Sequence, residues 1–377
     1  MITYKPCLAF DTLCALAHNN VKCVRDAEPA VQAFMAMIRE GLQLPPAVQK
    51  LSKVLECHFS LDDIEKMSVG ELADIYPQLM ANAAALHPST EFLLKRKDDI
   101  AEGLRRMAEY DFEKFWRLHF YDALINFCDV YAKYMETFDL TGLLNDVKII
   151  RQVNKVAQAA TLCFAQTNSL AVEKIEDIRV YVSFFSSGTS YMLNINSYVQ
   201  GYLPEHLKTP DRLMCTLAHE LCHGFMSGEL ARLYQHAYNN DPFLHQTHWF
   251  LINCAGSTDE EELVVAIENF IAVRNGLRTL EQAKENIGNH RSLSCMPIAV
   301  ILFDLLSKEP EIPSDINKWF IQCFESGYVD IGNIKSQADS LFGNFSAKFN
   351  ETWNSDNPHT AEKCKKYSPL DVQNETT

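Results

Sequence analysis

The chain of 377 residues lacks two features that would place it in or across a membrane. It has no long apolar run, because its most apolar stretch, Met296–Leu306, is too short to span a bilayer and contains Asp304. Its N-terminal apolar stretch is interrupted by Asp11, whereas a secretory signal needs an uninterrupted apolar core. We therefore expect no membrane segment and a cytoplasmic location, while export as an effector without a classical signal stays open.

Basic residues are few relative to acidic ones, with 34 Lys and Arg against 49 Asp and Glu, a net charge of −15. Such a balance argues against neutralising the phosphates of a nucleic acid. It also argues against docking on an anionic membrane surface. We expect neither nucleic acid nor membrane as a partner, and the oligomeric state is left open.

Closely spaced cysteine pairs are also missing. The twelve cysteines are scattered, with no CxxC pair and no short framework spacing. In a long chain without a secretion signal, this distribution is typical of free, buried thiols in a reducing compartment.

The first part of the chain, residues 1–144, reads as a helical domain or layer. Ser60 is placed to cap a helix that begins at Leu61, and Ser68 followed three residues later by Glu71 has the spacing of a capping box. The range 91–138 is rich in helix formers and has no strand-like alternation.

A second domain is predicted for residues 145–352, beginning with a long helix over 145–166. The runs 178–185 and 190–196 are rich in β-branched and aromatic residues, and they flank the turn sequence Ser186-Ser-Gly-Thr, which predicts a β-hairpin. Thr209 and Pro210 are placed to cap and open a helix that ends near Gly224.

The remainder of this domain is again expected to be helical. The predicted helices cover 258–277, 280–289, 297–307, 314–325 and 331–349. The tail, 353–377, is polar and is expected to be disordered. The predicted fold is mainly α (α+β), with a small hairpin or sheet before the helix that opens at Pro210.

That helix contains the motif His219-Glu220-Leu-Cys-His223. A spacing of four residues puts both imidazoles on one helical face, where two nitrogens can hold one ion. Glu220 lies beside them, where it could take a proton from a zinc-activated water and pass it to a leaving amine. The flanking residues are strongly apolar, so the helix should be buried, and buried histidines need partners that a metal would provide. Cys222, inside the motif, points away from the histidines and fits a core residue.

With this motif the sequence resembles the HExxH zincin metallopeptidases over the range 178–277. The resemblance implies one zinc ion per chain and a sheet edge that binds an extended peptide substrate. The run 190–196 matches that edge in position and character, with Tyr191, Leu193 and Asn194 as its substrate-binding residues.

A catalytic zinc needs a third protein ligand and an open position. The pattern of the metzincin branch is absent, since Glu229 stands where its third histidine should be. The gluzincin branch fits better, because it takes a glutamate from a second helix, here the one predicted over 258–277. By this resemblance Glu262 ranks first as the third ligand, with Glu261 and Glu268 as alternatives. Glu268 could instead orient a ligating histidine.

Several other polar residues have weaker claims. Glu260 fits a solvated first turn of the second helix. His245 and His248, in a predicted loop, could be ligands of a different zincin subtype, although surface or loop histidines are the favoured interpretation. The pair His290-Arg291 and the tyrosines Tyr191 and Tyr198 could stabilise an oxyanion, although packing roles suit the tyrosines.

The sequence therefore predicts a zinc-dependent metallopeptidase that acts on a peptide or protein. His219, His223 and Glu262 would hold the metal, and Glu220 would serve as general base and then acid. Two alternatives stay open: a zincin-like binding or regulatory module with weak catalysis, and a helical interaction protein in which the motif is incidental.

Overall fold

A computed structural model of the chain describes most of its residues. The described ranges are 2–17, 48–86, 91–137, 142–146, 177–186, 190–194, 196–223, 225–254, 257–288 and 294–354, with Pro29, Gln32, Phe34 and Ala36 as single positions. These residues are mainly helical, with one small sheet, so the predicted mainly α (α+β) class is confirmed. Almost all of the predicted helix 145–166 and of the tail 353–377 lies outside the described residues.

The chain divides into two compact units. Unit 1 comprises Met1–Leu140 and Gln158–Leu213, and unit 2 comprises Thr141–Ala157 and Met214–Thr377. The predicted boundary at residue 144 put the strands with the HExxH helix, whereas the structure groups the strands with the N-terminal helices. The reason is a parallel pairing between the N-terminal strand and residues 178–182.

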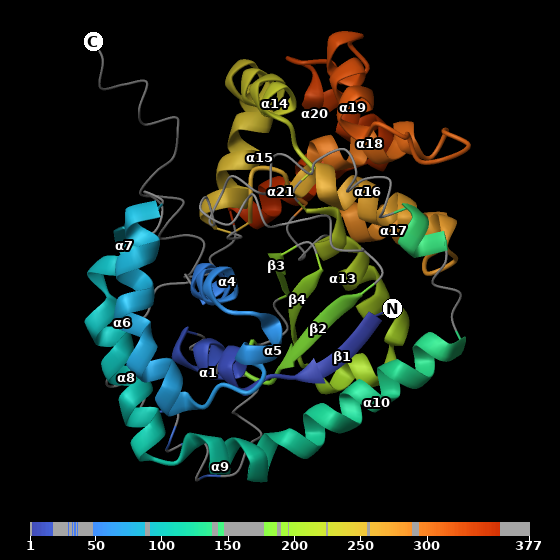
Figure 1. The fold of residues 1–377 in the computed structure, drawn as a ribbon. Helices are drawn as coiled ribbons and strands as arrows, with labels where there is room; N and C mark the ends of the chain where they lie inside the picture. Colours follow the sequence, from blue (N-terminus) through green and yellow to red (C-terminus); the bar gives the residue numbers. More distant parts are fainter. Residues whose placement is uncertain are drawn as a thin grey trace, which may run out of the picture. The chain divides into compact units, whose positions relative to one another are not determined.

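Unit 1 contains the sheet, and its strands run in the order β1-β2-β4-β3 (Figure 1). The strands are β1 (Ile2–Pro6), β2 (Ile178–Ser183), β3 (Tyr191–Asn194) and β4 (Ser197–Gly201). β2 pairs in parallel with both β1 and β4, and β3 runs antiparallel to β4 at the edge of the described sheet. Parallel strands are covered on both faces, which explains why β2 and β4 are almost continuously apolar or buried.

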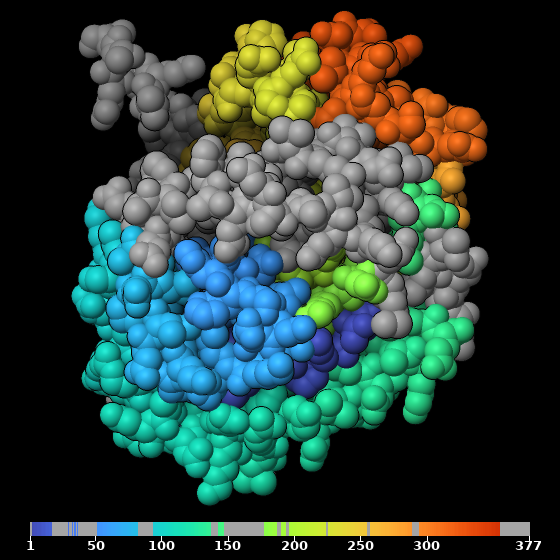
Figure 2. Space-filling model, in the orientation of Figure 1, coloured from blue at the N-terminus to red at the C-terminus, as the bar shows by residue number. Residues whose placement is uncertain are grey.

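Helices cover both faces of this sheet. The helices of unit 1 are α1 (Leu8–Ala17), α4 (Val48–His58), α5 (Leu61–Ile64), α6 (Val69–Leu86), α7 (Glu91–Lys95), α8 (Lys97–Glu109), α9 (Phe112–Trp116), a π-helical turn (Arg117–Tyr121), α10 (Asp122–Thr137) and a 3-10 helix (Pro204–Lys208). On one face, the ring of Tyr4 of β1 packs against that of Tyr131 of α10. On the other, Tyr181 of β2 contacts Phe10 of α1. Among the coloured atoms of this unit in Figure 2, most belong to its helices.

A buried carboxylate links the second face to the helices. Asp11 of α1 is fully buried. It accepts hydrogen bonds from the indole Nε1 of Trp116 and from the hydroxyl of Ser183. The backbone N–H of Phe185 donates a third, at 3.3 Å. An ionisable group thus stands at the junction of α1, α9 and β2.

Two local predictions for unit 1 are confirmed, and two are wrong. Ser60 caps α5 by accepting from Asp63 N–H, and Ser68 and Glu71 form the predicted capping box. The N-terminus, however, forms β1 instead of a helix. The runs 178–185 and 190–196 do not pair as a hairpin, because β4 lies between β2 and β3. Local alternation identifies strands but not their partners.

Helices are the only regular secondary structure among the described residues of unit 2. Its helices are α13 (Pro210–Cys222, whose first residues belong to unit 1), α14 (Gly228–Asn240), α15 (Pro242–Asn253), α16 (Glu261–Arg274), α17 (Leu280–Gly288), α18 (Pro297–Leu306), α19 (Ile316–Glu325), α20 (Ile334–Phe342) and α21 (Phe345–Trp353). α16 is central, since every residue from Glu261 to Ala272 is buried. The predicted helices over 258–277, 280–289, 297–307 and 314–325 correspond to α16 through α19.

Two predictions for unit 2 need correction. The range 331–349, expected as one helix, is divided into α20 and α21 at Gly343, whose φ of 78° ends the first helix. Residues 228–253, expected to include a loop, form α14 and α15. Both helices begin at side-chain N-caps, Ser227 and Asp241, each of which accepts from the N–H three residues later.

The cysteines largely match their prediction. Eight described cysteines are free, and all of these except Cys254 are buried. Cys57 is disulfide-bonded, so the expectation of free thiols is wrong for this residue.

Candidate metal centre

The two motif histidines lie at the end of α13 and face the same point. The helix begins at Pro210 as predicted, and Leu217, Ala218, Leu221 and Cys222 are fully or almost fully buried, which fixes its rotation. The Nε2 atoms of His219 and His223 lie 3.1 Å apart. Their side chains are 13% and 14% exposed, so both rings are largely buried.

Glu261, in the first turn of α16, faces the same pair of nitrogens. Its carboxylate oxygens lie 3.6 Å from Nε2 of His219 and 4.0 Å from Nε2 of His223. These three residues form a group whose ligand atoms all lie within 4.8 Å of one another.

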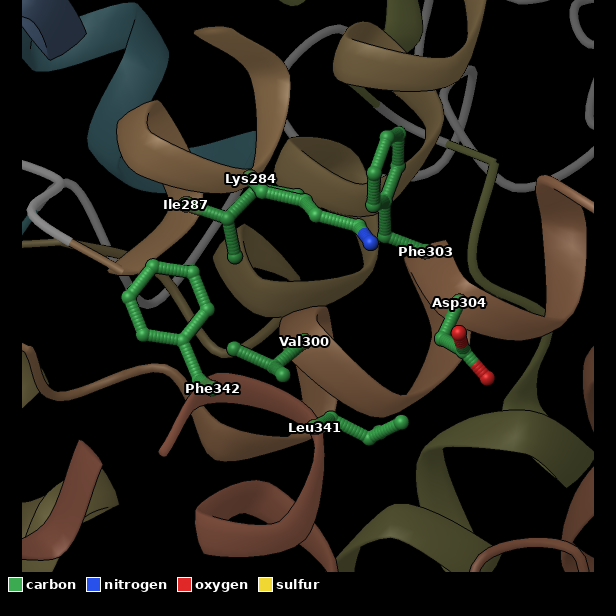
Figure 3. A pocket seen from close by; sticks show the side chains of 7 residues that line it. All are labelled: Lys284, Ile287, Val300, Phe303, Asp304, Leu341 and Phe342. Carbon is green, nitrogen blue, oxygen red and sulfur yellow. The ribbon is translucent and has the colours of Figure 1, made fainter. Parts of the chain in front are cut away.

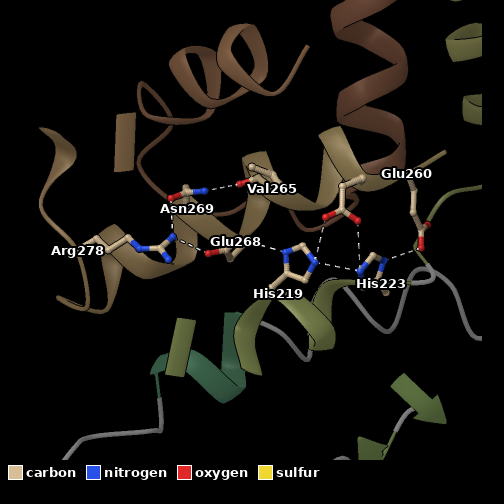
Figure 4. A network of polar contacts seen from close by, with 8 residues as sticks. His219, His223, Glu260, Val265, Glu268, Asn269 and Arg278 are labelled. Atoms are coloured by element: carbon tan, nitrogen blue, oxygen red, sulfur yellow. Dashed lines mark hydrogen bonds and ion pairs between the residues drawn. The ribbon is translucent and has the colours of Figure 1, made fainter. Parts of the chain in front are cut away.

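The opposite nitrogen of each ring contacts another carboxylate (Figure 4). Nδ1 of His219 lies 3.2 Å from Glu268, and Nδ1 of His223 lies 3.0 Å from Glu260. An ionised carboxylate can only accept a hydrogen bond, so each Nδ1 carries the proton. In the neutral rings, both Nε2 atoms then present lone pairs to each other and to Glu261.

Such a convergence of acceptors requires a cation. One proton is the simplest cation: burial lowers the pKa of His219, but Glu261, Glu268 and Glu220 together raise it to about 9. A divalent metal is the other, and it would bind all three residues at once. The 3.1 Å between the two Nε2 atoms fits either cation, because it is a hydrogen-bond distance and is also close to the about 3.3 Å that separates two nitrogens on a tetrahedral zinc at about 2.0–2.1 Å. The donor set of two imidazoles and one carboxylate is also one that catalytic zinc uses.

Glu262, ranked first as the third ligand, is not brought to the histidines. Its side chain is fully buried on another face of α16, where it accepts a hydrogen bond from the hydroxyl of Tyr234 at 2.7 Å. Its other oxygen accepts from the backbone N–H of Ile298 at 2.6 Å, at the start of α18. Burial raises the pKa of Glu262 to about 7, against the lowering effect of these hydrogen bonds. Of the three candidate glutamates, the structure thus brings Glu261, one helical step of about 100° from Glu262, to the Nε2 atoms of the histidines.

The remaining glutamates also have defined positions. Glu268 lies beside Nδ1 of His219, which is the position that its alternative prediction, orienting a ligating histidine, requires. Glu260 departs from its prediction, because it contacts His223 instead of standing in solvent and its side chain is 20% exposed. Glu220 is buried, and its negative charge acts on His219.

Three residues were predicted to bind substrate at the sheet edge. β3, which contains Tyr191, Leu193 and Asn194, is indeed the edge strand of the described sheet. Tyr191 and Leu193 are buried, and the hydroxyl of Tyr191 contacts that of Ser52 at 3.0 Å. Tyr191 and Tyr198 therefore fit the packing role.

The histidine alternatives lie elsewhere. His245 and His248 belong to α15 instead of a loop. His248 contacts Asp259 at 3.3 Å and Tyr234 at 3.3 Å, and among the described residues neither histidine joins a group of three possible ligands. His290 and Arg291 lie outside the described residues.

A separate small pocket lies among α17, α18 and α20 (Figure 3). Its walls are mostly apolar, formed by Ile287, Val300, Phe303, Leu341 and Phe342, with Lys284 and Asp304 as polar members. Asp304 forms an ion pair with Lys308 at 2.7 Å. This pocket offers no convergent donor set, so the metal centre is the stronger candidate for function.

Two further findings bear on the class of protein. Comparisons with protein-family models, with curated proteins and with solved structures give no match for the chain. Within the described part of the chain, no helix combines the length and the apolar character that crossing a bilayer requires.

Proposed function

We propose that the protein is a zinc-dependent metallopeptidase whose metal is held by His219, His223 and Glu261. The observation that carries this proposal is the convergence of two histidine Nε2 atoms, 3.1 Å apart, on the carboxylate of Glu261, with both Nδ1 atoms bound to carboxylates. Side chains arranged in this way favour a shared dication.

Three protein ligands would leave one tetrahedral position for water or substrate. When bound there, zinc would supply Lewis acidity to the attacking water and to the scissile carbonyl. Glu268 and Glu260 fix the tautomer and the orientation of His219 and His223, so that Nε2 of each ring faces inward.

Glu220 is the proposed general base. It takes a proton from water as the water oxygen attacks the carbonyl carbon, and it returns that proton to the amine nitrogen as the C–N bond breaks. Its place next to His219 on α13, and its burial at 7% exposure, suit a carboxylate that works away from bulk solvent. The choice of a peptide as substrate rests on the HExxH resemblance.

Metal analysis of two neighbouring variants tests the site. Wild type should hold about one zinc per chain. Removing a residue that only orients a ligand typically weakens metal binding about 10-fold to 100-fold, and Glu261→Gln, which removes a ligand itself, should weaken it by more. Glu262→Gln is the matched control and should retain zinc, since its carboxylate contacts Tyr234 and Ile298. A wild-type chain that stays empty in excess zinc would leave the helical interaction protein as the better explanation.

Activity on a peptide library tests the chemistry. Glu220→Gln should keep its zinc and lose about 10²-fold to 10⁴-fold in turnover, the usual contribution of a general base. If wild type binds zinc but cleaves no peptide, or if Glu220→Gln acts like wild type, the binding or regulatory module is favoured instead.

The cytoplasm remains the proposed location, and export of an effector the alternative. Free cysteines favour a reducing compartment, whereas the disulfide at Cys57 favours an oxidising one. Mass spectrometry after alkylation of protein taken from its native source would show whether Cys57 is oxidised there.

A further inference from the structure

Arg278 follows α16 and returns to lie beside it. Gly276, with a φ of 70°, reverses the chain after the helix, and the N–H of Leu277 bonds to the carbonyl of Ala272 at 2.9 Å. The reversal brings the guanidinium of Arg278 back to the middle of the helix, where its side chain is 16% exposed.

The guanidinium there binds two neighbouring side chains (Figure 4). Its Nη1 donates to Oε1 of Glu268 at 2.5 Å and to Oδ1 of Asn269 at 2.7 Å. Asn269 is itself fixed, because its amide donates to the carbonyl of Val265 at 2.8 Å and its Oδ1 also accepts from Asn286 at 3.3 Å. Arg278 is thus held by a rigid set of hydrogen bonds.

Glu268 lies between this arginine and the metal centre. One carboxylate oxygen contacts Arg278, and the other contacts Nδ1 of His219 at 3.2 Å. The side chain is only 4% exposed, and a buried carboxylate deprived of its cation is strongly unfavourable. Loss of the arginine would therefore displace the carboxylate or change its hydrogen bonding, and His219 would lose the group that orients it.

We propose that Arg278 is a positioning residue of the metal centre, acting through Glu268 on the ring of His219. This inference rests on the proposed function. It distinguishes the two ligating histidines, since His223 is oriented by Glu260, which is 20% exposed and stands at the N-cap of α16.

Zinc affinity, measured by competition with a chelating dye, tests the proposal. Arg278→Gln should weaken zinc binding by about 10-fold to 100-fold. Arg274→Gln is the matched control, because Arg274 also makes an ion pair in this unit, with Asp146 at 3.4 Å, but has no contact path to His219 through Glu268. Its zinc affinity should stay near that of wild type. Arg278→Lys keeps the charge and should lose less than Arg278→Gln, which preserves the test if the glutamine variant does not fold.

A double-mutant cycle separates this route from general destabilisation. If Arg278 acts through Glu268, then Arg278→Gln should cause little further loss of zinc affinity in a Glu268→Gln background. Equal affinity of wild type and Arg278→Gln, an equal loss in Arg274→Gln, or fully additive effects in the cycle would each overturn the proposal.

A second readout needs no metal. In ¹⁵N-histidine-labelled protein, the Nδ1 proton of His219, assigned by its absence in His219→Asn, should give a protected downfield NMR signal. The signal should be lost or shifted in Arg278→Gln and kept in Arg274→Gln. If wild type binds no zinc, the proposed function fails, and this signal still decides the positioning role: its persistence in Arg278→Gln would refute it.

Discussion

Asp11 offers a quantitative test of the packing in unit 1. Its carboxyl group is fully buried between α1, α9 and β2, and burial raises its pKa from 3.8 to about 6, against the lowering effect of hydrogen bonds from Ser183, Trp116 and Phe185. The perturbation is Asp11→Asn, which keeps the shape and most hydrogen bonds of the protonated acid but cannot ionise.

The direction and size of the effect follow from linkage. Between pH 3.8 and 6 the folded chain holds a proton on Asp11 that the unfolded chain has released, so the free energy of unfolding falls as the pH rises through this window. A shift of about two pKa units corresponds to about 3 kcal/mol in total. Because the unfolded acid is already mostly ionised at pH 4.5, about 2 kcal/mol of this remains to be lost between pH 4.5 and 7.5.

Urea unfolding at several pH values, in the presence of a chelator, measures the free energy of unfolding of wild type and of Asp11→Asn. Trp116 donates to Asp11, so ¹⁹F NMR of 5-fluorotryptophan-labelled protein gives a local probe, assigned with Trp116→Phe. Wild type should lose about 2 kcal/mol relative to the variant as the pH rises from 4.5 to 7.5. A difference that is flat, or that grows in favour of wild type, would show that the three hydrogen bonds outweigh burial and would refute the reasoning.

Three more predictions concern unit 2. Removing bound metal with a chelator should lower the melting temperature in calorimetry, and added zinc should restore it; an unchanged temperature would contradict a metal centre. Asp241→Ala should lower the free energy of unfolding in urea by about 2–4 kcal/mol, because Asp241 caps α15 at Leu244 and also accepts from the N–H of Ile334 at 3.1 Å. A decrease below about 1 kcal/mol would contradict this. Gly343→Ala should lower the free energy of unfolding by about 1–2 kcal/mol, because φ at this position is 78°. Gly228→Ala should be neutral or slightly stabilising, because nothing lies within 4 Å of the new Cβ. Equal effects of the two substitutions would refute the backbone argument.

The HExxH helix could be predicted because its signals are local. Pro210 opens it, and the spacing of His219 and His223 directs both rings to one side. The capping box of Ser68 and Glu71 was predictable for the same reason. Each of these features depends on residues within one or two helical turns.

The sequence alone could narrow the candidates for the third ligand only to the glutamates of one helix. Adjacent residues differ by about 100° around the helix axis, so the choice between Glu261 and Glu262 depends on how α16 is rotated in the core. That rotation is fixed by tertiary packing, including the hydrogen bond that the backbone N–H of Ile298 donates to Glu262. Arg278 was missed because its contact with Glu268 depends on the chain reversal at Gly276.

The sheet was unpredictable for a related reason. β1 has its partner at Ile178 and the following residues, far along the chain, and a short strand with a distant partner leaves little local pattern. The insertion of β4 between β2 and β3 likewise depends on pairing that no turn sequence specifies.

The burial of α16 on all sides has a consequence for how this sequence can evolve. From Glu261 to Ala272 the helix has no exposed position, and its consecutive glutamates Glu260, Glu261 and Glu262 face three different partners. A helix of this kind has almost no neutral sites, whereas α8, with a strongly exposed face, has many. Among relatives of this chain, we expect the spacing and identity of residues in α16 to change most slowly, even where the surrounding sequence has diverged beyond easy alignment.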